Sequence, residues 1–183
     1  GNSFEEVCKI LSKLTGVKIK NRIALVGIGM GQEGTLTAEA AERIRKADYL
    51  FGAERLLSSV KNDHAARYPY YLAKDILPEL ERISGSGAEV VILFSGDTGF
   101  YSGCARLYEK LKERTDCTVR ICPGISSVSY FAARTGYSYQ DAAVTSIHGH
   151  GEDDLWKAKL AETIRFFGKT FVLMSGKKDV QLL

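Results

Sequence analysis

Residues 22–31 read RIALVGIGMG, and this stretch decides the fold. A short apolar run passes there into three glycines at alternate positions, Gly27, Gly29 and Gly31. An apolar run this short that ends on glycine is typical of a buried parallel strand. Glycine has no Cβ and tolerates positive φ, so a ligand can approach the backbone closely. The following TLTAEAAERIRKA predicts a helix, and strand, glycine turn and helix together place a site at the carboxyl edge of a sheet.

Apolar strands and amphipathic helices alternate along the rest of the chain. Further strands are expected at 90–94 within AEVVILFSGD, in CTVRICPGI (117–125), where the strand ends on Pro123-Gly124, and in DAAVTSIHGHG (141–151). Repeated strand–helix units favour right-handed crossovers and a largely parallel sheet. The fold class is therefore α/β, with a largely parallel sheet flanked by helices.

Four of these strands end in similar turns, GIGMG, FSGDTGFYS, CPGISS and SIHGHG. The carboxyl ends of parallel strands share one edge, so we expect the four turns to converge. The first three turns contain no Lys or Arg. Backbone groups would then make most ligand contacts, which suits a neutral or zwitterionic nucleoside-type ligand better than a phosphate.

Composition narrows the class of protein. The 183 residues are 45% hydrophobic and 26% charged, with a net charge of +3, which is too small to indicate a nucleic-acid partner. No apolar run approaches the ~20 residues that cross a bilayer, and no signal peptide is recognisable. The four cysteines, Cys8, Cys104, Cys117 and Cys122, form no C-x-x-C pair. We expect buried free thiols, no metal site and a cytoplasmic location.

Two motif matches offer alternative functions. Residues 29–34, GMGQEG, match the G-x-G-x-x-G of NAD(P)-binding Rossmann-type oxidoreductases. In that motif the helix opens inside the glycines, whereas Thr35 and Thr37 indicate a later start here. Asp97-Thr98-Gly99 matches an aspartic-protease half-site, but that chemistry needs two carboxylates sharing a proton, and the chain has no second D-T-G.

Four longer segments together resemble the tetrapyrrole methylase family of S-adenosylmethionine (SAM) methyltransferases. They are VGIGMGQEGTLTAEAAERIRKADYLFGAERLL, LFSGDTGFYSGCARL, CPGISSVSYFAARTG and SIHGH, and the resemblance covers residues 22–176. It implies a two-domain fold, with an N-terminal α/β domain at 21–121 and a C-terminal α/β domain at 122–183 that is incomplete here. Residues 1–20 would form a helix and linker. They are either the tail of a preceding fused domain, resembling the end of a pathway reductase, or a chain-specific extension.

The family resemblance also implies SAM bound mostly by backbone in a cleft between the domains. Met30 stands where the family usually has proline, and His150 where it often has arginine. Val128 and Met174 are equally expected as core residues, and Asp97 as the N-cap of a helix that begins near Tyr101. Carried over motif by motif, the cofactor-binding residues are Gly29, Met30, Gly31, Gly96, Asp97, Phe100, Ser127, Val128 and Met174.

The segments ADYLFGAERLL, SGDTGFYS and SIHGH most resemble family members that methylate C5 of a precorrin ring in cobalamin biosynthesis. Methyl transfer to carbon is an in-line displacement that depends chiefly on positioning. His148 is the candidate base, with a structural histidine as the alternative. Tyr101, Arg106 and Arg134 are candidates to meet substrate carboxylates. Another methylase of the pathway and a non-catalytic dimerising module stay open, and the resemblance implies a homodimer.

Overall fold

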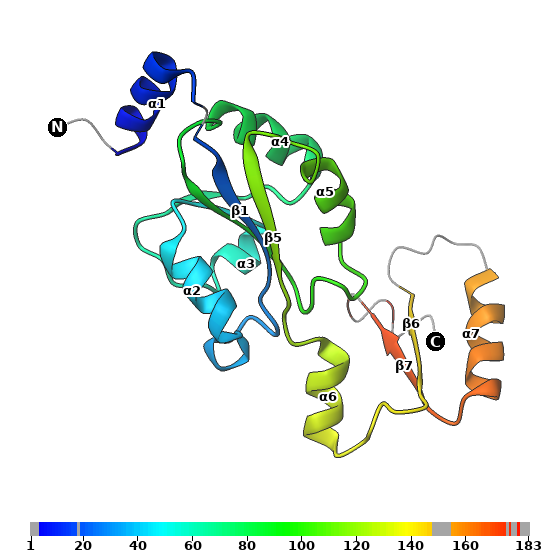
Figure 1. Ribbon diagram of the computed structural model, residues 1–183. Helices are drawn as coiled ribbons and strands as arrows, with labels where there is room; N and C mark the ends of the chain where they lie inside the picture. Colours follow the sequence, from blue (N-terminus) through cyan, green and yellow to red (C-terminus); the bar gives the residue numbers. More distant parts are fainter. Residues whose placement is uncertain (1–3, 18, 148–154, 175, 177–178, 180–183) are drawn as a thin grey trace. The chain divides into compact units, whose positions relative to one another are not determined.

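The computed structural model describes residues 4–17, 19–147 and 155–174, together with Gly176 and Asp179 (Figure 1). Contacts divide the chain into two compact units, residues 1–127 (unit 1) and 128–183 (unit 2). No helix in the described ranges is long and apolar enough to span a membrane.

Unit 1 contains a five-stranded, fully parallel sheet, which confirms the predicted fold class. Its strands follow the order β3-β2-β4-β1-β5, so the glycine strand β1 lies between β4 and β5. Strand β3 lies at an edge of this sheet and pairs with β2 alone in the described residues. The strands are β1 (Asn21–Gly27), β2 (Tyr49–Phe51), β3 (Ala66–Tyr68), β4 (Glu89–Phe94) and β5 (Cys117–Cys122).

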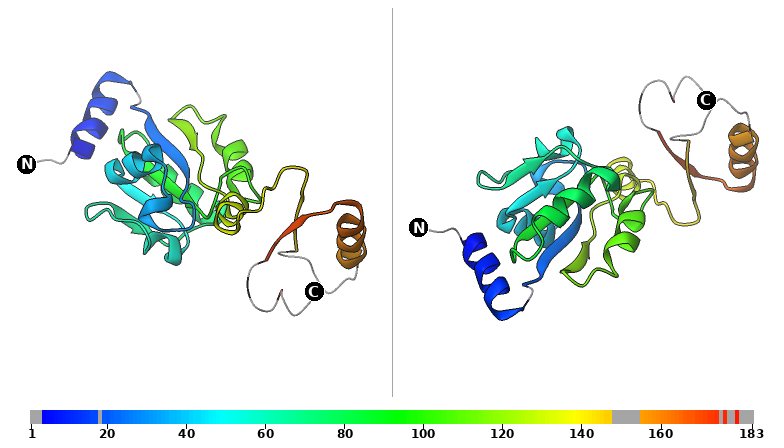
Figure 2. Two further views of the ribbon diagram at one scale, coloured as in Figure 1. Left: turned by 90° about the horizontal axis from the view of Figure 1, so that it is seen from below. Right: turned by 90° about the horizontal axis from the view of Figure 1, so that it is seen from above.

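Helices cover both faces of this sheet, as Figures 1 and 2 show. Ile23 and Leu25 of β1 pack into one core cluster with α4 (Ala73–Arg82) and α5 (Cys104–Leu111). The alternate residues Ala24 and Val26 pack into a second cluster with α2 (Ala38–Lys46) and α3 (Glu54–Leu57). Successive side chains of a strand point to opposite faces, so a continuous apolar run is what a doubly covered strand requires.

Two helix starts locate the loops that follow β1 and β4. The Thr37 hydroxyl caps α2 by accepting a hydrogen bond from Ala40 N at 3.1 Å, so this helix begins well after Gly31. A short 3₁₀ turn, η1 (Glu33–Thr35), lies between. The helix expected from near Tyr101 begins only at Cys104. Tyr101 has a φ of 49°, which an α-helix cannot contain.

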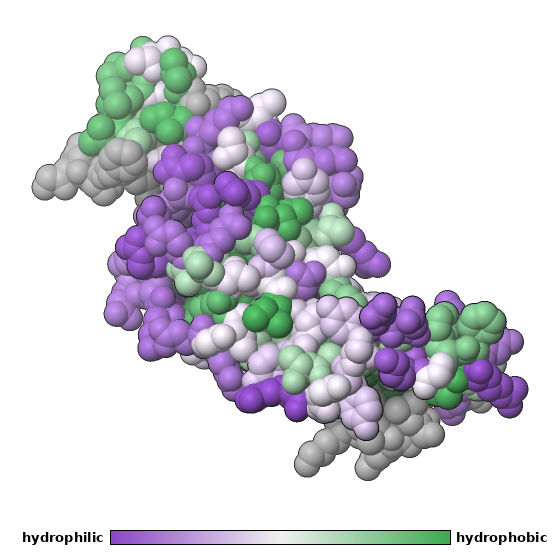
Figure 3. Space-filling model, turned by 60° about the horizontal axis from the view of Figure 1, so that its bottom comes forward, coloured by the Kyte–Doolittle hydropathy of each residue, from purple (hydrophilic) through white to green (hydrophobic). Residues whose placement is uncertain are grey.

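Helix α1 (Phe4–Thr15) precedes the sheet and is anchored by Cys8, which is buried and lies with Ile19 beside Gly87. Other apolar residues of α1 are exposed, among them Leu11 and Leu14. Figure 3 shows hydrophobic surface, in green, at the upper left of the molecule. All four cysteines are buried and free, as predicted.

Unit 2 comprises the small parallel sheet of β6 (Ala143–Ser146) and β7 (Thr170–Leu173), with α6 starting at the boundary (Ser127–Thr135) and α7 (Leu155–Phe166). Its core consists of Ile147, Trp156 and Leu160, with Val172 packed against them. The expectation that four strand ends share one edge is therefore wrong for β6. This strand pairs with β7 and does not extend the sheet of unit 1. The prediction failed because the apolar pattern of a segment indicates a strand without specifying which strand it pairs with.

Candidate functional site

Three loops meet at the carboxyl edge of the unit 1 sheet. They are residues 28–37 after β1 (the first loop), 95–103 after β4 (the second loop) and 123–126 after β5 (the third loop). The first two are joined by a pair of backbone hydrogen bonds, from Gly29 N to Gly96 O at 3.1 Å and from Gly96 N to Gly29 O at 2.9 Å. The predicted convergence is thus correct for these three turns.

Two glycines, Gly27 and Gly124, let these strand ends pack backbone against backbone. A Cβ added to Gly124 would lie 2.1 Å from Gly96 O and 2.7 Å from Gly27 C. A Cβ added to Gly27 would lie 2.7 Å from Gly124 N. At positions 27 and 124, glycine is therefore required by the neighbouring loop, and not by a ligand.

Two other glycines face open space at the same edge. Gly31 has a φ of 76° and Gly96 a φ of 66°, a left-handed conformation that glycine adopts without strain. A Cβ at Gly96 would meet nothing within 4 Å, and one at Gly31 only the Ser59 side chain, at 3.5 Å. Gly31 and Gly96 are half-buried, and the side on which a Cβ would project stays uncrowded at both positions.

Asp97 links the second loop to the third. Its Oδ1 accepts a hydrogen bond from Gly99 N at 2.9 Å, and its Oδ2 accepts one from Gly124 N at 3.0 Å. The interpretation of Asp97 as a helix N-cap is wrong, since α5 begins at Cys104 and has Gly103 at its N-cap. Hydrogen bonds to a charged acceptor are worth roughly 1.5–3 kcal/mol each, so this carboxylate fixes the loop geometry.

Thr35 organises the first loop around Met30. Its side chain is buried, and its Oγ1 accepts hydrogen bonds from Met30 N at 3.1 Å and Gln32 N at 3.4 Å while donating to Gln32 O at 2.8 Å. Sequence reasoning missed this role and treated Thr35 as one of two candidate caps for α2. The sequence Thr35-Leu36-Thr37 contained the signal for this role. One threonine, Thr37, is enough to cap α2, so the other was available for a different hydrogen bond.

Two aromatic rings stand on the second loop. Phe100 and Tyr101 make an edge-to-face pair with ring centroids 5.2 Å apart. Phe100 is half-buried, whereas Tyr101 is 62% exposed despite its positive φ. A non-glycine residue held in this conformation stores strain, as is common at functional sites. Burial and the nearby Asp97 raise the pKa of the Cys104 thiol to about 11, so this neighbour remains an unreactive thiol.

The remaining predicted site residues are distributed differently. Ser127 is the exposed first residue of α6, and Val128 beside it is buried in unit 2. Met174 follows β7 and is 41% exposed. The Arg134 guanidinium lies 5.4 Å from the centroid of the Tyr130 ring, a cation–π contact. His148 and His150 lie outside the described residues.

The charges of the strand-end loops favour a ligand without phosphates. The charged residues of the three loops are Glu33 and Asp97, and Glu33 pairs at the surface with Lys61 at 3.0 Å. Helix α2 does not open from the glycines, so its N-terminal amides cannot cradle a pyrophosphate there. These observations disfavour the dinucleotide interpretation and fit the cationic sulfonium and zwitterionic amino-acid group of SAM. In the described ranges, no three His, Cys, Asp or Glu side chains are grouped to hold a metal.

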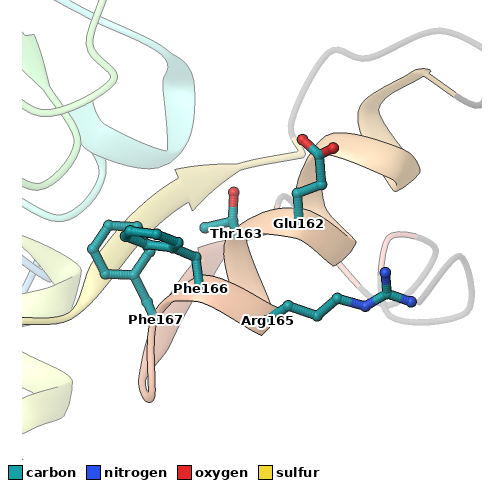
Figure 4. A pocket seen from close by; sticks show the side chains of 5 residues that line it. All are labelled: Glu162, Thr163, Arg165, Phe166 and Phe167. Carbon is teal, nitrogen blue, oxygen red and sulfur yellow. The ribbon is translucent and has the colours of Figure 1, made fainter.

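A cavity of about 530 Å³ in unit 2 contains none of the predicted site residues. It is lined by the end of α7, and Figure 4 shows the Phe166 and Phe167 rings side by side while Arg165 points away from them. Its lining has no pair of groups suited to acid–base or nucleophilic chemistry, so the strand ends remain the candidate site.

Comparison with known proteins agrees with this placement. Over 134 residues the chain is 31% identical to a precorrin-6Y C(5,15)-methyltransferase (decarboxylating) of Sinorhizobium sp, covering 70% of this chain and 31% of that protein. It is 34% identical to a cobalt-precorrin-7 C(5)-methyltransferase of Salmonella typhimurium, covering 69% of this chain and 61% of the relative. A crystal structure of a cobalamin-biosynthesis precorrin-6Y methylase from Archaeoglobus fulgidus superimposes with a TM-score of 0.55 at 25% identity, covering 69% and 64% of the two chains.

The chain thus spans about a third of the first relative and less than two thirds of the other two. The family model for tetrapyrrole (corrin/porphyrin) methylases matches residues 22–183, which leaves only α1 and its linker outside. From its glycine strand to its last residue, the chain belongs to the tetrapyrrole methylase family.

Proposed function

We propose that this protein is a SAM-dependent methyltransferase that methylates C5 of a precorrin or cobalt-precorrin ring in cobalamin biosynthesis. The observation that carries the proposal is the strand-end site, where hydrogen bonds hold together three glycine-containing loops that have no Lys or Arg. The chain that forms this site belongs to the tetrapyrrole methylase family. The match to the C(5,15) relative covers about a third of that protein, and another relative carries only C(5) in its name. This supports the C5 position.

In this proposal, the backbone of Gly29, Met30 and Gly31 and of Gly96 holds the cofactor, with Phe100 beside it. SAM supplies a methyl group on a cationic sulfonium, which loses its charge on transfer. Asp97 contributes to the same site by holding the second and third loops together. Ser127, Val128 and Met174 stay predicted cofactor contacts.

The chain's other task is to orient the macrocycle so that its carbon faces the methyl group, since such displacement depends on alignment. We propose Tyr101 and Arg134 as partners for the ring's carboxylates and His148 as the base that removes a proton after transfer. Tyr101 is an exposed aromatic residue on the second loop.

Isothermal titration calorimetry with SAM, S-adenosylhomocysteine and NAD⁺ tests the cofactor. We expect heat of binding with the two adenosyl sulfur compounds and none with NAD⁺. Binding of NAD⁺ without SAM would reverse the assignment in favour of the Rossmann-type alternative.

Mass spectrometry of the product tests the reaction. With SAM and a precorrin-7 substrate we expect the mass gain of one methyl group, and NMR of the product should place that group at C5. A methyl group at another ring carbon would favour a different methylase of the pathway.

We further propose a cytoplasmic homodimer, with α1 as the end of a fused pathway domain. Light scattering of the purified protein distinguishes dimer from monomer, and a dimer without methylation would favour the dimerising module.

A further inference from the structure

Another cavity, of about 400 Å³, lies in unit 1 between α2 and the outer strand β5. Three arginines line it, Arg22 of β1, Arg43 of α2 and Arg120 of β5, together with Thr118 and the apolar Ala24 and Val119. Arg22 stands five residues before Gly27, at the start of β1. At ~3.3 Å per residue Arg22 lies about 16 Å from the end of β1, whereas Ala24 and Arg120 stand nearer, three and two residues before the ends of their strands. The lining residues belong to β1, α2 and β5 and not to the three strand-end loops, so the cavity is distinct from the proposed SAM site.

The cavity has more positive than negative charge. Arg22 Nε contacts Glu89 Oε1 at 2.6 Å, and Arg120 Nε contacts Glu39 Oε1 at 2.8 Å. Arg43 is half-buried and forms no ion pair with any residue in the described part of the chain. Three guanidinium groups therefore face two carboxylates. Each guanidinium has five N–H donors, so a contact through Nε leaves donors for a further acceptor.

Protection of the sheet edge explains only part of this arrangement. In the described residues β5 pairs with β1 alone, and a charge on such an edge prevents pairing with other chains. Protection of the edge accounts for Arg120. It does not explain why a cavity lies beside the strand, or why Arg43 is half-buried there without a carboxylate partner in the described residues. The volume is within the roughly 300–1,000 Å³ range of small-molecule pockets. Guanidinium forks match the geometry of carboxylate and phosphate groups.

We propose that this arginine cavity binds a small molecule that carries phosphate or carboxylate groups on an apolar body. The anionic groups contact Arg43 and the free donors of Arg22 and Arg120, and the apolar part lies against Ala24, which is on the same face of the sheet as Arg22 and Arg120. This site is independent of methyl transfer, and its test does not depend on the proposed cofactor.

Calorimetry and amide NMR with two probes, inorganic pyrophosphate and benzene-1,3,5-tricarboxylate, test the proposal at low salt. We expect at least one probe to bind and to shift the amides of Thr118 and Arg120 but not those of Gly29 and Gly96. Pyrophosphate alone would identify a phosphate ligand, and the tricarboxylate alone a carboxylate ligand. Failure of both probes to bind, or shifts confined to the strand-end loops, would overturn the proposal.

Arg43→Gln should weaken binding roughly 10-fold or more, since a lost charge-assisted contact costs about 1.5 kcal/mol or more. Arg45→Gln is the matched control on the same helix, because Arg45 is exposed and pairs with Glu42 at 2.9 Å outside the cavity. It should change affinity less than about 2-fold, the scale of a surface charge. Equal weakening by both variants would indicate diffuse charge attraction and would contradict a defined site. Circular dichroism verifies that Arg43→Gln remains folded.

Discussion

Substituting Gly124 by alanine tests the backbone packing that holds the strand-end site together. The new Cβ would lie 2.1 Å from Gly96 O, whereas ordinary contact begins at 3.4 Å, so one strand end must move by about 1.3 Å. Both Gly96 and Gly27, the two neighbours, are backbone and cannot rotate away. Overpacking costs ~1–3 kcal/mol, and moving the loop also removes part of the Asp97 bond to Gly124 N, which is worth roughly 1.5–3 kcal/mol when fully formed.

Together these effects lower the free energy of unfolding by about 3 kcal/mol. For a chain of this size, 1 kcal/mol shifts Tm by roughly 2–4 °C, so Gly124→Ala should melt about 6–12 °C below the wild type. Thermal unfolding followed by circular dichroism, with urea unfolding as a second measure, gives the value. The control Gly34→Ala should stay within about 0.5 kcal/mol of the wild type. If Gly124→Ala melts like the wild type and like Gly34→Ala, the three loops are not packed as described.

Three further changes test individual side chains. Thr35→Val removes the hydrogen-bond acceptor for Met30 N, so it should lower the free energy of unfolding by about 1–2 kcal/mol and weaken SAM binding in calorimetry. Thr35→Ser keeps the hydroxyl and should behave like the wild type in both measurements. Asp97→Asn keeps one carbonyl oxygen for two backbone donors, so calorimetry should show weaker SAM binding and NMR a shifted Gly124 amide; an unchanged amide would argue against the link. The folded-state pKa of Cys104 is raised from 9.0 to about 11, so folding retains a proton that the unfolded chain releases. Stability should therefore fall as pH rises through this window, and urea unfolding of Cys104→Ala should show a shallower decline.

Local patterns predicted much of this fold. The apolar runs at β1 and β4 and the intervening helices were sufficient for a parallel α/β sheet, because burial on both faces requires continuous apolar strands. The late start of α2 could also be predicted, since Thr37 is a good N-cap close to the apolar helix face. Identification of the family came from the order of the motifs and not from any one of them.

Contacts between distant segments could not be predicted in the same way. The hydrogen bond from Gly124 N to Asp97 joins residues 27 positions apart, and no local pattern specifies it. The glycine requirement at Gly27 likewise depends on a loop almost a hundred residues later. The pairing of β6 with β7 is a third case, because hydrophobic periodicity identifies a strand but leaves its neighbour open.

The central claim is that the strand-end loops bind SAM, and a crystal structure of this protein with S-adenosylhomocysteine tests it most directly. The account predicts the ligand within hydrogen-bonding distance of backbone atoms in residues 29–31 and 96–100, with Asp97 still bonded to Gly124 N. A ligand bound elsewhere, with these loops untouched, would contradict it.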